Sequence, residues 1–359
     1  MAIVPEAAGR LAGAGWEIAV QAGAGAKAHF TDAAYRDKGA TVVDSATGLL
    51  ASADVVAKVQ PPTANEVATL PEGAILVSFL QPLANLETVR ALAERKMTAF
   101  SLDLLPRISR AQSMDALSSQ ATVSGYRAAL TGAQQLAKFF PMFMTAAGTV
   151  PPAKVLVMGA GVAGLQAIAT ARRLGAQVRA YDVRTAAKEE VESLGATFVD
   201  LGLEAQDGAG GYAREQTEEF LALQRERLGI EVMASDVVIT TAAIPGRKAP
   251  VLVTKEMVAG MGEGAVIVDL AADSGGNCEL SEPGVDAKHG GVLVCGISNP
   301  PSGMPTHASF LYARNIVNFL ALLVADGELR PDFEDEIVSG TCVVRAGEVV
   351  HGPTKEALS

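Results

Sequence analysis

Hydrophobic and polar positions along the chain change repeatedly between a strand-like and a helix-like period. In the first third, short apolar runs predict strands at Glu17–Val20, Asp54–Val59, Ala74–Phe79 and Met97–Leu102. Segments with helical periodicity separate these runs. Because strands that alternate with helices pair in parallel sheets, the first third predicts an α/β domain.

A longer helical pattern follows, from about Ser113 to Phe139, where apolar residues recur at three- and four-residue spacing. Glycine and proline then interrupt the pattern between Thr145 and Pro152. A second alternating series begins at Lys154. We therefore expect the long helix to bridge two domains.

The second series predicts six strands, which is the number in a complete Rossmann sheet. They lie at Lys154–Met158, Gln177–Tyr181, Ala196–Val199, Asp236–Thr240, Ala265–Leu270 and Gly291–Cys295. Leu311–Val324 then predicts a second bridging helix. Ile337–Val350 predicts a terminal hairpin that turns at Ala346-Gly347 and returns to the first domain.

The predicted fold is therefore α/β, with two Rossmann-like domains that have parallel sheets, long bridging helices between them and a cleft. With 359 residues, 49% of them hydrophobic, the chain is large enough for two cores. We expect residues 1–125 and 310–359 to form the N-terminal domain and residues 126–309 the nucleotide-binding domain.

Composition excludes several classes of function. A net charge of -11 disfavours nucleic acid as a partner, because phosphate backbones are bound by basic surfaces. The three cysteines form no C-x-x-C motif, which indicates reduced thiols in the cytoplasm. The longest apolar segment near the C-terminus, Ile316–Ala325, is shorter than the roughly 20 residues that span a bilayer. No two of the four histidines have metal-ligand spacing, so we expect no metal.

The strongest chemical motif follows the first strand of the second series. There an apolar run leads into Gly159-Ala160-Gly161-Val162-Ala163-Gly164, the G-x-G-x-x-G pattern, and then into a helix. Glycine permits a tight turn at the first position, close approach of a pyrophosphate at the second, and close helix packing at the third. The pattern predicts binding of a dinucleotide at the start of the helix.

Asp182 ends the next predicted strand, where a carboxylate can accept hydrogen bonds from the hydroxyls of an adenosine ribose. It would also repel a 2′-phosphate, so NAD(H) is expected over NADP(H). Arg184 is a reservation, since arginine can hold a 2′-phosphate in other Rossmann proteins. The simpler alternative is a glycine-rich turn beside an acidic surface residue.

A second cluster of polar residues, Arg107–Asp115, lies between a predicted strand and the long helix. Two guanidinium groups, an amide and a carboxylate in so short a segment can grip a carboxamide and position a ring. A helix start capped by Ser113 or Asp115, with solvated arginines, explains the same residues equally well.

Arg107–Gln112, followed by Ser113-Met114-Asp115-Ala116-Leu117-Ser118-Ser119 and Gly125-Tyr126-Arg127, resembles the RISRAQSxDxLSS…GYR block of the transhydrogenase α subunit, domain I. The resemblance continues through Thr145–Gly148, Gly159–Gly164, Gly211–Ala213, Ile244–Gly246 and Asp269–Ala271. It covers almost the whole chain.

The resemblance implies two groups of site residues. Arg107, Gln112, Asp115 and Ser118 would act at the nicotinamide, with Gln112 nearest the ring of the partner's nucleotide and Arg107 orienting the carboxamide. The implied cofactor-binding residues are Arg107, Ile108, Ser109, Arg110, Gly159, Gly161, Val162, Ala163, Gly164, Asp182, Val183, Arg184, Gly211, Tyr212, Gln224 and Ala243, with Tyr212 on a closing loop.

The implied activity is that of the NAD(H)-binding component of a proton-translocating NAD(P) transhydrogenase of the Si-specific/Re-specific type, active only with partner subunits. Hydride passes directly between NADH and NADP⁺ bound on a separate domain III, and membrane-spanning subunits couple this step to proton movement. The resemblance also implies a homodimer that is cytoplasmic and peripheral on the cytoplasmic face of the inner membrane.

One departure from the family concerns the start of the chain. Members usually open with a strand and a basic segment, whereas this sequence begins inside the next motif, at Met1–Glu6. We expect the first strand to be missing, through truncation or a misplaced start, and its neighbours to be left with unpaired backbone groups.

Two other functions remain as alternatives. Alanine dehydrogenase shares the fold but uses a histidine where this chain has Phe79, and Lys58 is either a remnant of its substrate site or part of a structural ion pair. A non-catalytic NAD-sensing module would use the same fold to bind NADH without transferring hydride.

Overall fold

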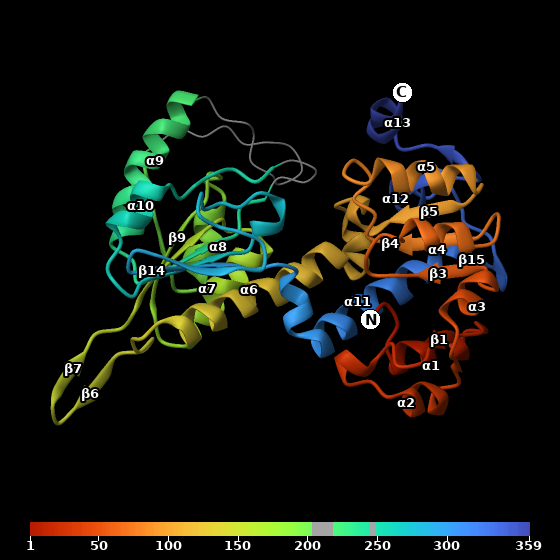
Figure 1. Ribbon diagram of the computed structural model, residues 1–359, viewed down its shortest axis with the longest axis horizontal. Coiled ribbons are helices and arrows are strands. Elements are labelled where there is room, and N and C mark those ends of the chain that lie inside the picture. The colour runs from red at the N-terminus through yellow and green to blue at the C-terminus, as the bar shows by residue number, and fades with distance from the viewer. Residues whose placement is uncertain (203–217, 244–247) are drawn as a thin grey trace. The chain divides into compact units, whose positions relative to one another are not determined.

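The computed structural model describes residues 1–202, 218–243 and 248–359 (Figure 1). The chain divides into two compact units, residues Met1–Gln120 with Met304–Ser359, and residues Ala121–Gly303. The chain passes from the first unit to the second within helix α6 (Ala116–Gln135). The boundaries expected from the sequence lie a few residues further along the chain.

Unit 1 contains a five-stranded sheet in the order β18-β17-β5-β4-β3, in which β3, β4 and β5 are parallel. A separate parallel pair, β1-β2, lies nearer the N-terminus. The elements of the first segment are α1 (Pro5–Gly13), β1 (Ala19–Gln21), α2 (Asp32–Asp37), β2 (Thr41–Val43), α3 (Ala46–Ala51), β3 (Val55–Ala57), α4 (Ala64–Thr69), β4 (Ile75–Ser78), α5 (Leu86–Glu94) and β5 (Thr98–Ser101). Those of the second are α11 (Pro305–Leu320), β15 (Val324–Ala325), β16 (Glu328–Leu329), α12 (Glu336–Thr341), β17 (Cys342–Arg345), β18 (Glu348–Val349) and α13 (Gly352–Leu358).

Apolar layers cover both faces of the five-stranded sheet. On one face, Val77 and Phe100 pack against Ile316 and Phe319 of α11. On the other, the strands pack against Val89 and Leu92 of α5 and Val67 of α4. Strands buried on both faces need continuous apolar runs, which is why β4 and β5 were visible in the sequence.

The predicted terminal hairpin is half wrong. Its turn at Ala346-Gly347 and its second half are confirmed by β17 and β18, but residues Glu336–Thr341 form helix α12. Asp335 caps this helix by accepting hydrogen bonds from the N–H groups of Ile337 (2.7 Å) and Val338 (3.4 Å). β-Branched residues in this segment favoured a strand, but the cap stabilises a helix there, and β-propensity depends strongly on context.

Unit 2 is built on a seven-stranded sheet in the order β10-β9-β8-β11-β12-β14-β13. Six strands are parallel in Rossmann order, and β13 adds an antiparallel edge that the sequence did not predict. The elements are β6 (Phe143–Thr145), β7 (Gly148–Val150), β8 (Lys154–Met158), α7 (Val162–Arg173), β9 (Gln177–Tyr181), α8 (Ala187–Ser193), β10 (Thr197–Phe198), α9 (Glu218–Met233), β11 (Val237–Thr240), α10 (Lys255–Gly260), β12 (Val266–Asp269), β13 (Asp286–His289) and β14 (Val292–Gly296).

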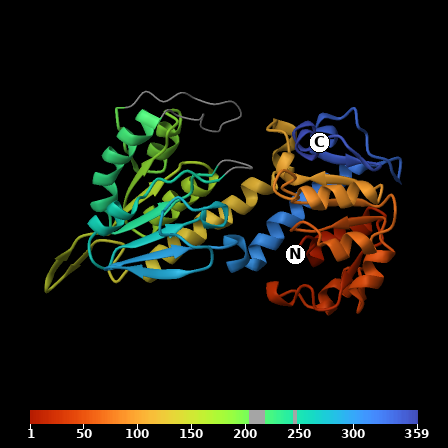
Figure 2. The same ribbon diagram turned by 45° about the horizontal axis from the view of Figure 1, so that its top comes forward.

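Helices cover both faces of this sheet (Figure 1 and Figure 2). Residues of α6, α7 and α8, such as Ala129, Ile168 and Val191, share one apolar cluster with the strands. Residues of α9 and α10, such as Leu228 and Met257, share the other. Strands β8, β9 and β11 are parallel neighbours in this sheet. Their carboxyl ends, and the loops that follow them, therefore lie at the same edge of the sheet.

A hairpin of β6 and β7 leaves the body of unit 2, as Figure 1 shows. The sequence indicated only an interruption in this region. Gly148 allows the turn, because its φ of +126° is one that side-chain-bearing residues rarely adopt. Thr145 supports it by donating a hydrogen bond from its hydroxyl to the Gly148 carbonyl (3.1 Å).

Within the described residues, no helix is both long enough and apolar enough to cross a membrane.

Candidate functional site

The G-x-G-x-x-G segment forms the turn between β8 and α7. Gly159 has a φ of +101°, and a Cβ there would lie 2.6 Å from the hydroxyl oxygen of Thr241. A Cβ on Gly164 would lie 1.8 Å from the carbonyl oxygen of Gly159. Since real Cβ atoms do not approach so closely, the helix packs against the strand only with glycine at both positions.

Gly161 differs from these two glycines, because its surroundings are open. It precedes α7, and a Cβ there would meet no atom within 4 Å. The first hydrogen bond of the helix runs from the Leu165 N–H to the Gly161 carbonyl (2.8 Å), so the N–H groups of Val162 and Ala163 come before it. In the described chain no side chain caps this end. Open space beside unpaired amides fits an anionic phosphate.

Asp182 lies at the carboxyl end of β9, beside the same turn, and is 9% exposed. Its Oδ2 accepts a hydrogen bond from the N–H of Ala160 (2.7 Å). Arg184 folds back onto this carboxylate: its Nε and backbone N–H donate to Oδ1 (2.9 and 2.8 Å), and one terminal nitrogen donates to Oδ2 (2.9 Å). The predicted ribose carboxylate is thus fixed to the glycine turn and held by its neighbouring arginine.

Three further predicted residues lie at this edge of unit 2. Gln224 of α9 is buried and donates from Nε2 to the hydroxyl of Tyr181 (2.7 Å). Burial raises the pKa of that tyrosine, so it stays neutral at physiological pH. Ala243 is exposed and follows β11, while Val183 is half-buried between Asp182 and Arg184. Gly211 and Tyr212, with the closing loop expected at Tyr212, lie outside the described residues.

A buried polar network near the end of β12 was missed by the sequence reading. Asp269 accepts hydrogen bonds from the Thr240 hydroxyl and from the N–H groups of Ala271, Asn277 and Cys278, at 2.8 to 3.0 Å. Asn277 then donates to the carbonyls of Ala242 and Pro250, each at 2.8 Å. The network therefore links the end of β12 to the backbone at Ala242 and at Pro250. The family motif Asp269-Leu270-Ala271 was the only sequence signal for it.

In unit 1, the cluster Arg107–Asp115 forms a 3-10 turn, Ser109–Met114, that leads into α6. Its residues have different surroundings. Arg107, Ser109 and Gln112 are exposed, whereas Ile108 packs against the core of unit 1. Arg110 forms a double hydrogen bond with Asp335, at 2.6 and 2.9 Å.

Asp115 and Ser118 are brought together as the start of α6. The two carboxylate oxygens of Asp115 accept hydrogen bonds from the N–H (2.8 Å) and the hydroxyl (2.6 Å) of Ser118. The sequence offered Ser113 or Asp115 as the capping residue of this helix. The structure shows that Asp115 is the cap. The Ser113 carbonyl instead accepts from Asn315 of α11 at 2.9 Å.

Phe79 directly follows β4, at the position where the sequence comparison expected the histidine of alanine dehydrogenase. Phe79 is 9% exposed and its ring packs against Tyr312, with 5.2 Å between centroids. Lys58 forms an ion pair with Glu66, which also completes the cap of α4 by accepting from the N–H of Thr63. Although burial alone would raise the pKa of Glu66, hydrogen bonds from Lys58 and Thr63 and the charge of Lys58 lower this pKa below its ordinary value. Lys58 is thus part of a structural ion pair.

All three cysteines of the chain are buried free thiols. Burial raises the pKa of Cys278 and Cys342 to about 11 and that of Cys295 to about 12. Such thiols are poor nucleophiles, because the thiolate is the reactive form. Among the described residues, no three His, Cys, Asp or Glu side chains form a group that could hold a metal ion.

The fold and this edge of unit 2 define a two-domain α/β protein with a Rossmann dinucleotide-binding turn. Residues 1–124 match the family model for the N-terminal domain of alanine dehydrogenase/PNT, and residues 128–352 match that for its C-terminal domain. The chain belongs to the alanine dehydrogenase/PNT family, within its group of NAD(P) transhydrogenase alpha subunits.

Similar proteins support this placement. An NAD(P) transhydrogenase alpha subunit of Rhodospirillum rubrum is 52% identical, over 98% of this chain and 94% of its own length. The crystal structure of transhydrogenase from Sinorhizobium meliloti has a TM-score of 0.88 and 44% identity, covering 97% of this chain and 95% of its own. An alanine dehydrogenase of Mycobacterium tuberculosis is 31% identical over 91% of this chain and 84% of its own length.

Proposed function

We propose that this chain is the NAD(H)-binding component of a proton-translocating NAD(P) transhydrogenase. The enzyme would be of the Si-specific/Re-specific type and active only with its partner subunits. The observation that carries the proposal is the glycine turn with Asp182 beside it, in a chain that is 52% identical to a transhydrogenase alpha subunit.

The residues of unit 2 would hold the nucleotide. Gly161, Val162 and Ala163 offer open space and amides to the pyrophosphate, and Asp182 offers its carboxylate to the ribose hydroxyls. Val183 and Arg184 flank that carboxylate. Gly211, Tyr212, Gln224 and Ala243 complete the proposed site, by resemblance to the family.

Residues of unit 1 would serve the nicotinamide. Arg107 orients the carboxamide, and Ile108, Ser109 and Arg110 border it. Gln112 lies nearest the second nucleotide, with Asp115 and Ser118 in the same pocket. The nicotinamide supplies the hydride, and the work of these residues is to orient the ring and exclude water. Such positioning needs no general acid or base, which agrees with a phenylalanine at position 79.

Partners follow from the same proposal. NADP⁺ would be bound by a separate domain III, and membrane-spanning subunits would couple hydride transfer to proton translocation. This chain would be cytoplasmic, docked on the cytoplasmic face of the inner membrane. Its charge of -11 makes nucleic acid an unsuitable partner.

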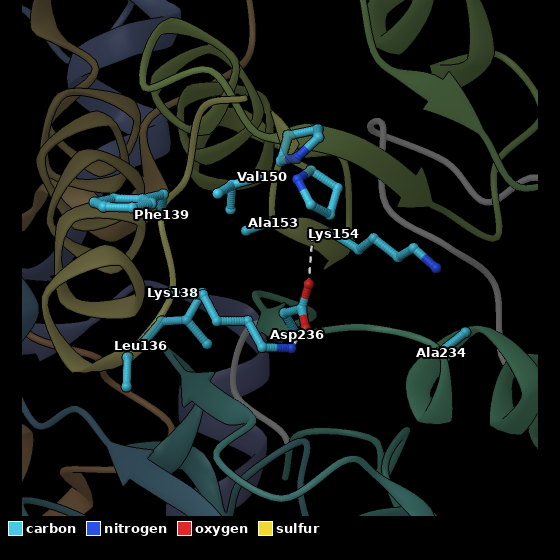
Figure 3. Close-up of a pocket in the computed structure, with 11 residues that line it drawn as sticks. Leu136, Lys138, Phe139, Val150, Ala153, Lys154, Ala234 and Asp236 are labelled. Carbon is cyan, nitrogen blue, oxygen red and sulfur yellow. Dashed lines mark hydrogen bonds and ion pairs between the residues drawn. The ribbon is translucent and has the colours of Figure 1, made fainter. Parts of the chain in front are cut away.

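We also propose that the chain is a homodimer whose interface includes the β6–β7 hairpin. Apolar side chains on the hairpin and just before it are exposed: Met144 of β6 is 79% exposed, and Phe139 and Met142, which precede β6, are 58% and 56% exposed. Beside the hairpin lies a pocket of about 810 Å³ lined by apolar residues including Leu136, Val150 and Pro151, together with Lys138, Lys154 and Asp236 (Figure 3). One surface that offers both an apolar projection and an apolar hollow is complementary to a second copy of itself.

The test mixes the purified chain with a domain III loaded with NADP⁺ and follows oxidation of NADH by stopped-flow absorbance. Alanine with NAD⁺ is the control substrate. Transfer to the NADP⁺ side supports the proposal. NADH binding without transfer would indicate a sensing module, and turnover of alanine would indicate an alanine dehydrogenase.

A further inference from the structure

Asn277 is a fully buried residue that connects the end of β12 with two other points of the unit 2 backbone. Its own N–H donates to Oδ2 of Asp269 (2.8 Å). Its side-chain amide donates to the carbonyl of Ala242, shortly after β11, and to the carbonyl of Pro250, each at 2.8 Å. One side chain therefore joins the backbone that leaves β11 to the backbone at Pro250.

The two hydrogen bonds of this side chain require an amide. Carbonyl oxygens only accept, so the group that faces two of them must donate twice, which a neutral NH₂ group does. An ionised aspartate in its place could only accept and would repel both carbonyls. Among the described residues, the other polar atom of the side chain, Oδ1, is buried without a hydrogen-bond partner. The contribution of Asn277 therefore lies in its N–H groups.

The backbone that Asn277 holds lies against the glycine turn. The N–H of Thr241 donates to the Met158 carbonyl (2.9 Å), and the Thr241 hydroxyl donates to the Gly159 carbonyl (3.1 Å). A Cβ on Gly159 would lie 3.2 Å from the backbone nitrogen of Ala242. Because Asn277 binds the carbonyl of the same Ala242, this backbone is held between the glycine turn and the buried amide.

The strand order indicates which half of a dinucleotide this backbone would meet. Strand β8 lies between β9 and β11, and the chain adds β9 and β10 on one side before it crosses to β11 on the other. Dinucleotides bind across this reversal, at the carboxyl ends of the strands. The turn after the first strand takes the pyrophosphate, and the end of the second strand, here β9, takes the adenosine ribose. The backbone after β11 therefore lies on the side of the nicotinamide half.

From this placement we propose that Asn277 is a positioning residue for the nicotinamide half of NAD(H). Since Asn277 is fully buried, it acts through the backbone of Thr241 and Ala242 and so places the exposed Ala243 that follows them. The inference rests on the proposed function, because it presupposes that the glycine turn binds NAD(H). It assigns a role in nucleotide binding to a residue outside the glycine motif.

Binding of a fragment separates this role from a general effect on the fold. ADP has the adenosine half and both phosphates of NADH but lacks the nicotinamide ribose and ring. Titration calorimetry on the full chain measures the affinities of the wild type, Asn277→Ala and Asn277→Asp for NADH and for ADP. Thr254→Ala is the matched control, since it destabilises unit 2 by removing the cap of α10 and leaves the side-chain contacts of Asn277 in place. Circular dichroism checks that each variant is folded.

We expect both Asn277 variants to bind NADH about tenfold more weakly than the wild type, because two buried carbonyls lose their donors and the backbone after β11 shifts. Their affinity for ADP should stay within about twofold of the wild-type value, since the adenosine side of the site is unchanged. The control should bind both ligands as the wild type does.

Hydrogen exchange of the wild type tests the placement of this backbone without any substitution, so the inference stays testable if neither variant folds. Mass spectrometry follows the peptides that contain residues 236–243 and 248–253. NADH should slow exchange in these peptides more than ADP does, because only NADH has a group on the side of β11.

Other outcomes overturn the inference. Equal losses of NADH and ADP affinity in a folded variant would mean that Asn277 supports the whole unit rather than one half of the site. Unchanged NADH affinity would mean that it has no role in binding, and equal protection by the two ligands would contradict the placement of the backbone after β11. A wild type that binds neither ligand contradicts the proposed function itself, whereas wild-type NADH binding with equal losses in the variants refutes only the role of Asn277.

Discussion

The guanidinium of Arg110 and the carboxylate of Asp335, 225 positions apart in the sequence, meet in a double hydrogen bond of 2.6 and 2.9 Å. The same carboxylate caps α12. The turn that contains the proposed nicotinamide residues is therefore tied to the C-terminal segment of unit 1. Arg110 has a structural role even if it also borders the nucleotide.

The ion pair predicts a dependence of stability on pH. Arg110 and the capped N–H groups lower the pKa of Asp335 from 3.8 to about 2. A carboxyl group with a depressed folded-state pKa stabilises the fold above its unfolded-state pKa, and this contribution is lost as the pH falls through about 2. Asp335→Asn keeps the cap but removes the charge. We expect it to lower the free energy of unfolding by up to about 1 kcal/mol at neutral pH, because the pair is partly exposed.

Urea unfolding of both proteins across the acidic range measures this difference. The gap between the wild type and Asp335→Asn should close as the pH approaches 2. A gap that is constant over the whole range would mean that the charge of Asp335 contributes nothing.

A substitution at Gly161 should weaken nucleotide binding without unfolding the protein. Because a Cβ there meets no atom within 4 Å, Gly161→Ala should change the free energy of unfolding by no more than about 1 kcal/mol. The added methyl group would occupy the space proposed for the pyrophosphate, so NADH affinity should fall at least about tenfold. Calorimetry and thermal unfolding measure the two effects. Gly262→Ala, at an equally open glycine of unit 2, is the control and should bind NADH normally.

Asp115 allows its capping role to be separated from a role at the nicotinamide. Asp115→Ala removes the cap of α6 and should destabilise the protein by about 1 kcal/mol. Asp115→Asn retains an oxygen for the Ser118 N–H and should be nearly as stable as the wild type. If the carboxylate also acts on the bound ring, the asparagine variant transfers hydride more slowly in the stopped-flow assay. Unchanged transfer in this variant would leave Asp115 with the capping role alone.

Gln112 is the residue proposed to lie nearest the second nucleotide. Gln112→Asn shortens an exposed side chain, so it should slow hydride transfer more than it weakens NADH binding. The stopped-flow rate and the calorimetric affinity are compared in the same preparation. Gln177→Asn makes the same change at the exposed start of β9 and should alter neither quantity. A variant with weakened affinity and an unaltered transfer rate would contradict the assigned role.

The hairpin interface can be tested by charge. Met144→Asp places a carboxylate on the most exposed apolar side chain of the hairpin and should convert a dimer into monomers, because burying an unpaired charge is costly. Sedimentation velocity measures the change. Val285→Asp modifies another exposed apolar residue of unit 2, 41% exposed, and should leave the dimer intact. A wild type that sediments as a monomer, or a Met144→Asp protein that remains dimeric, would be inconsistent with this interface.

The elements predicted most accurately from the sequence are those whose conformation is determined mainly by the local pattern of apolar and turn residues. The ends of β8 and β9 were predicted to the residue, because apolar runs bounded by turn residues suit buried parallel strands. The long helix was predicted, but α6 begins at Ala116 rather than Ser113, since the preceding residues form a 3-10 turn. Local periodicity does not distinguish these two helical conformations.

Tertiary contacts explain the remaining differences. The partnership of Arg110 with Asp335 leaves no trace in a local pattern, because charged residues at such distant positions have many possible partners. The same holds for Asn277, which is fully buried and joins the carbonyls of Ala242 and Pro250. The motif located the glycine turn and Asp182, but only the structure shows that Arg184 binds that carboxylate.

The glycines of the turn would drift differently over evolutionary time. Any single-base change that replaces Gly164 adds a Cβ that collides with the Gly159 carbonyl, whether or not a nucleotide is ever bound. A descendant that had lost the cofactor would still retain this glycine, for reasons of packing alone. Gly161 has no such internal constraint. Replacement of Gly161 in a descendant would therefore indicate that the ligand had been lost. Gly159 and Gly164 would be retained in either case, so they would not reveal such a loss.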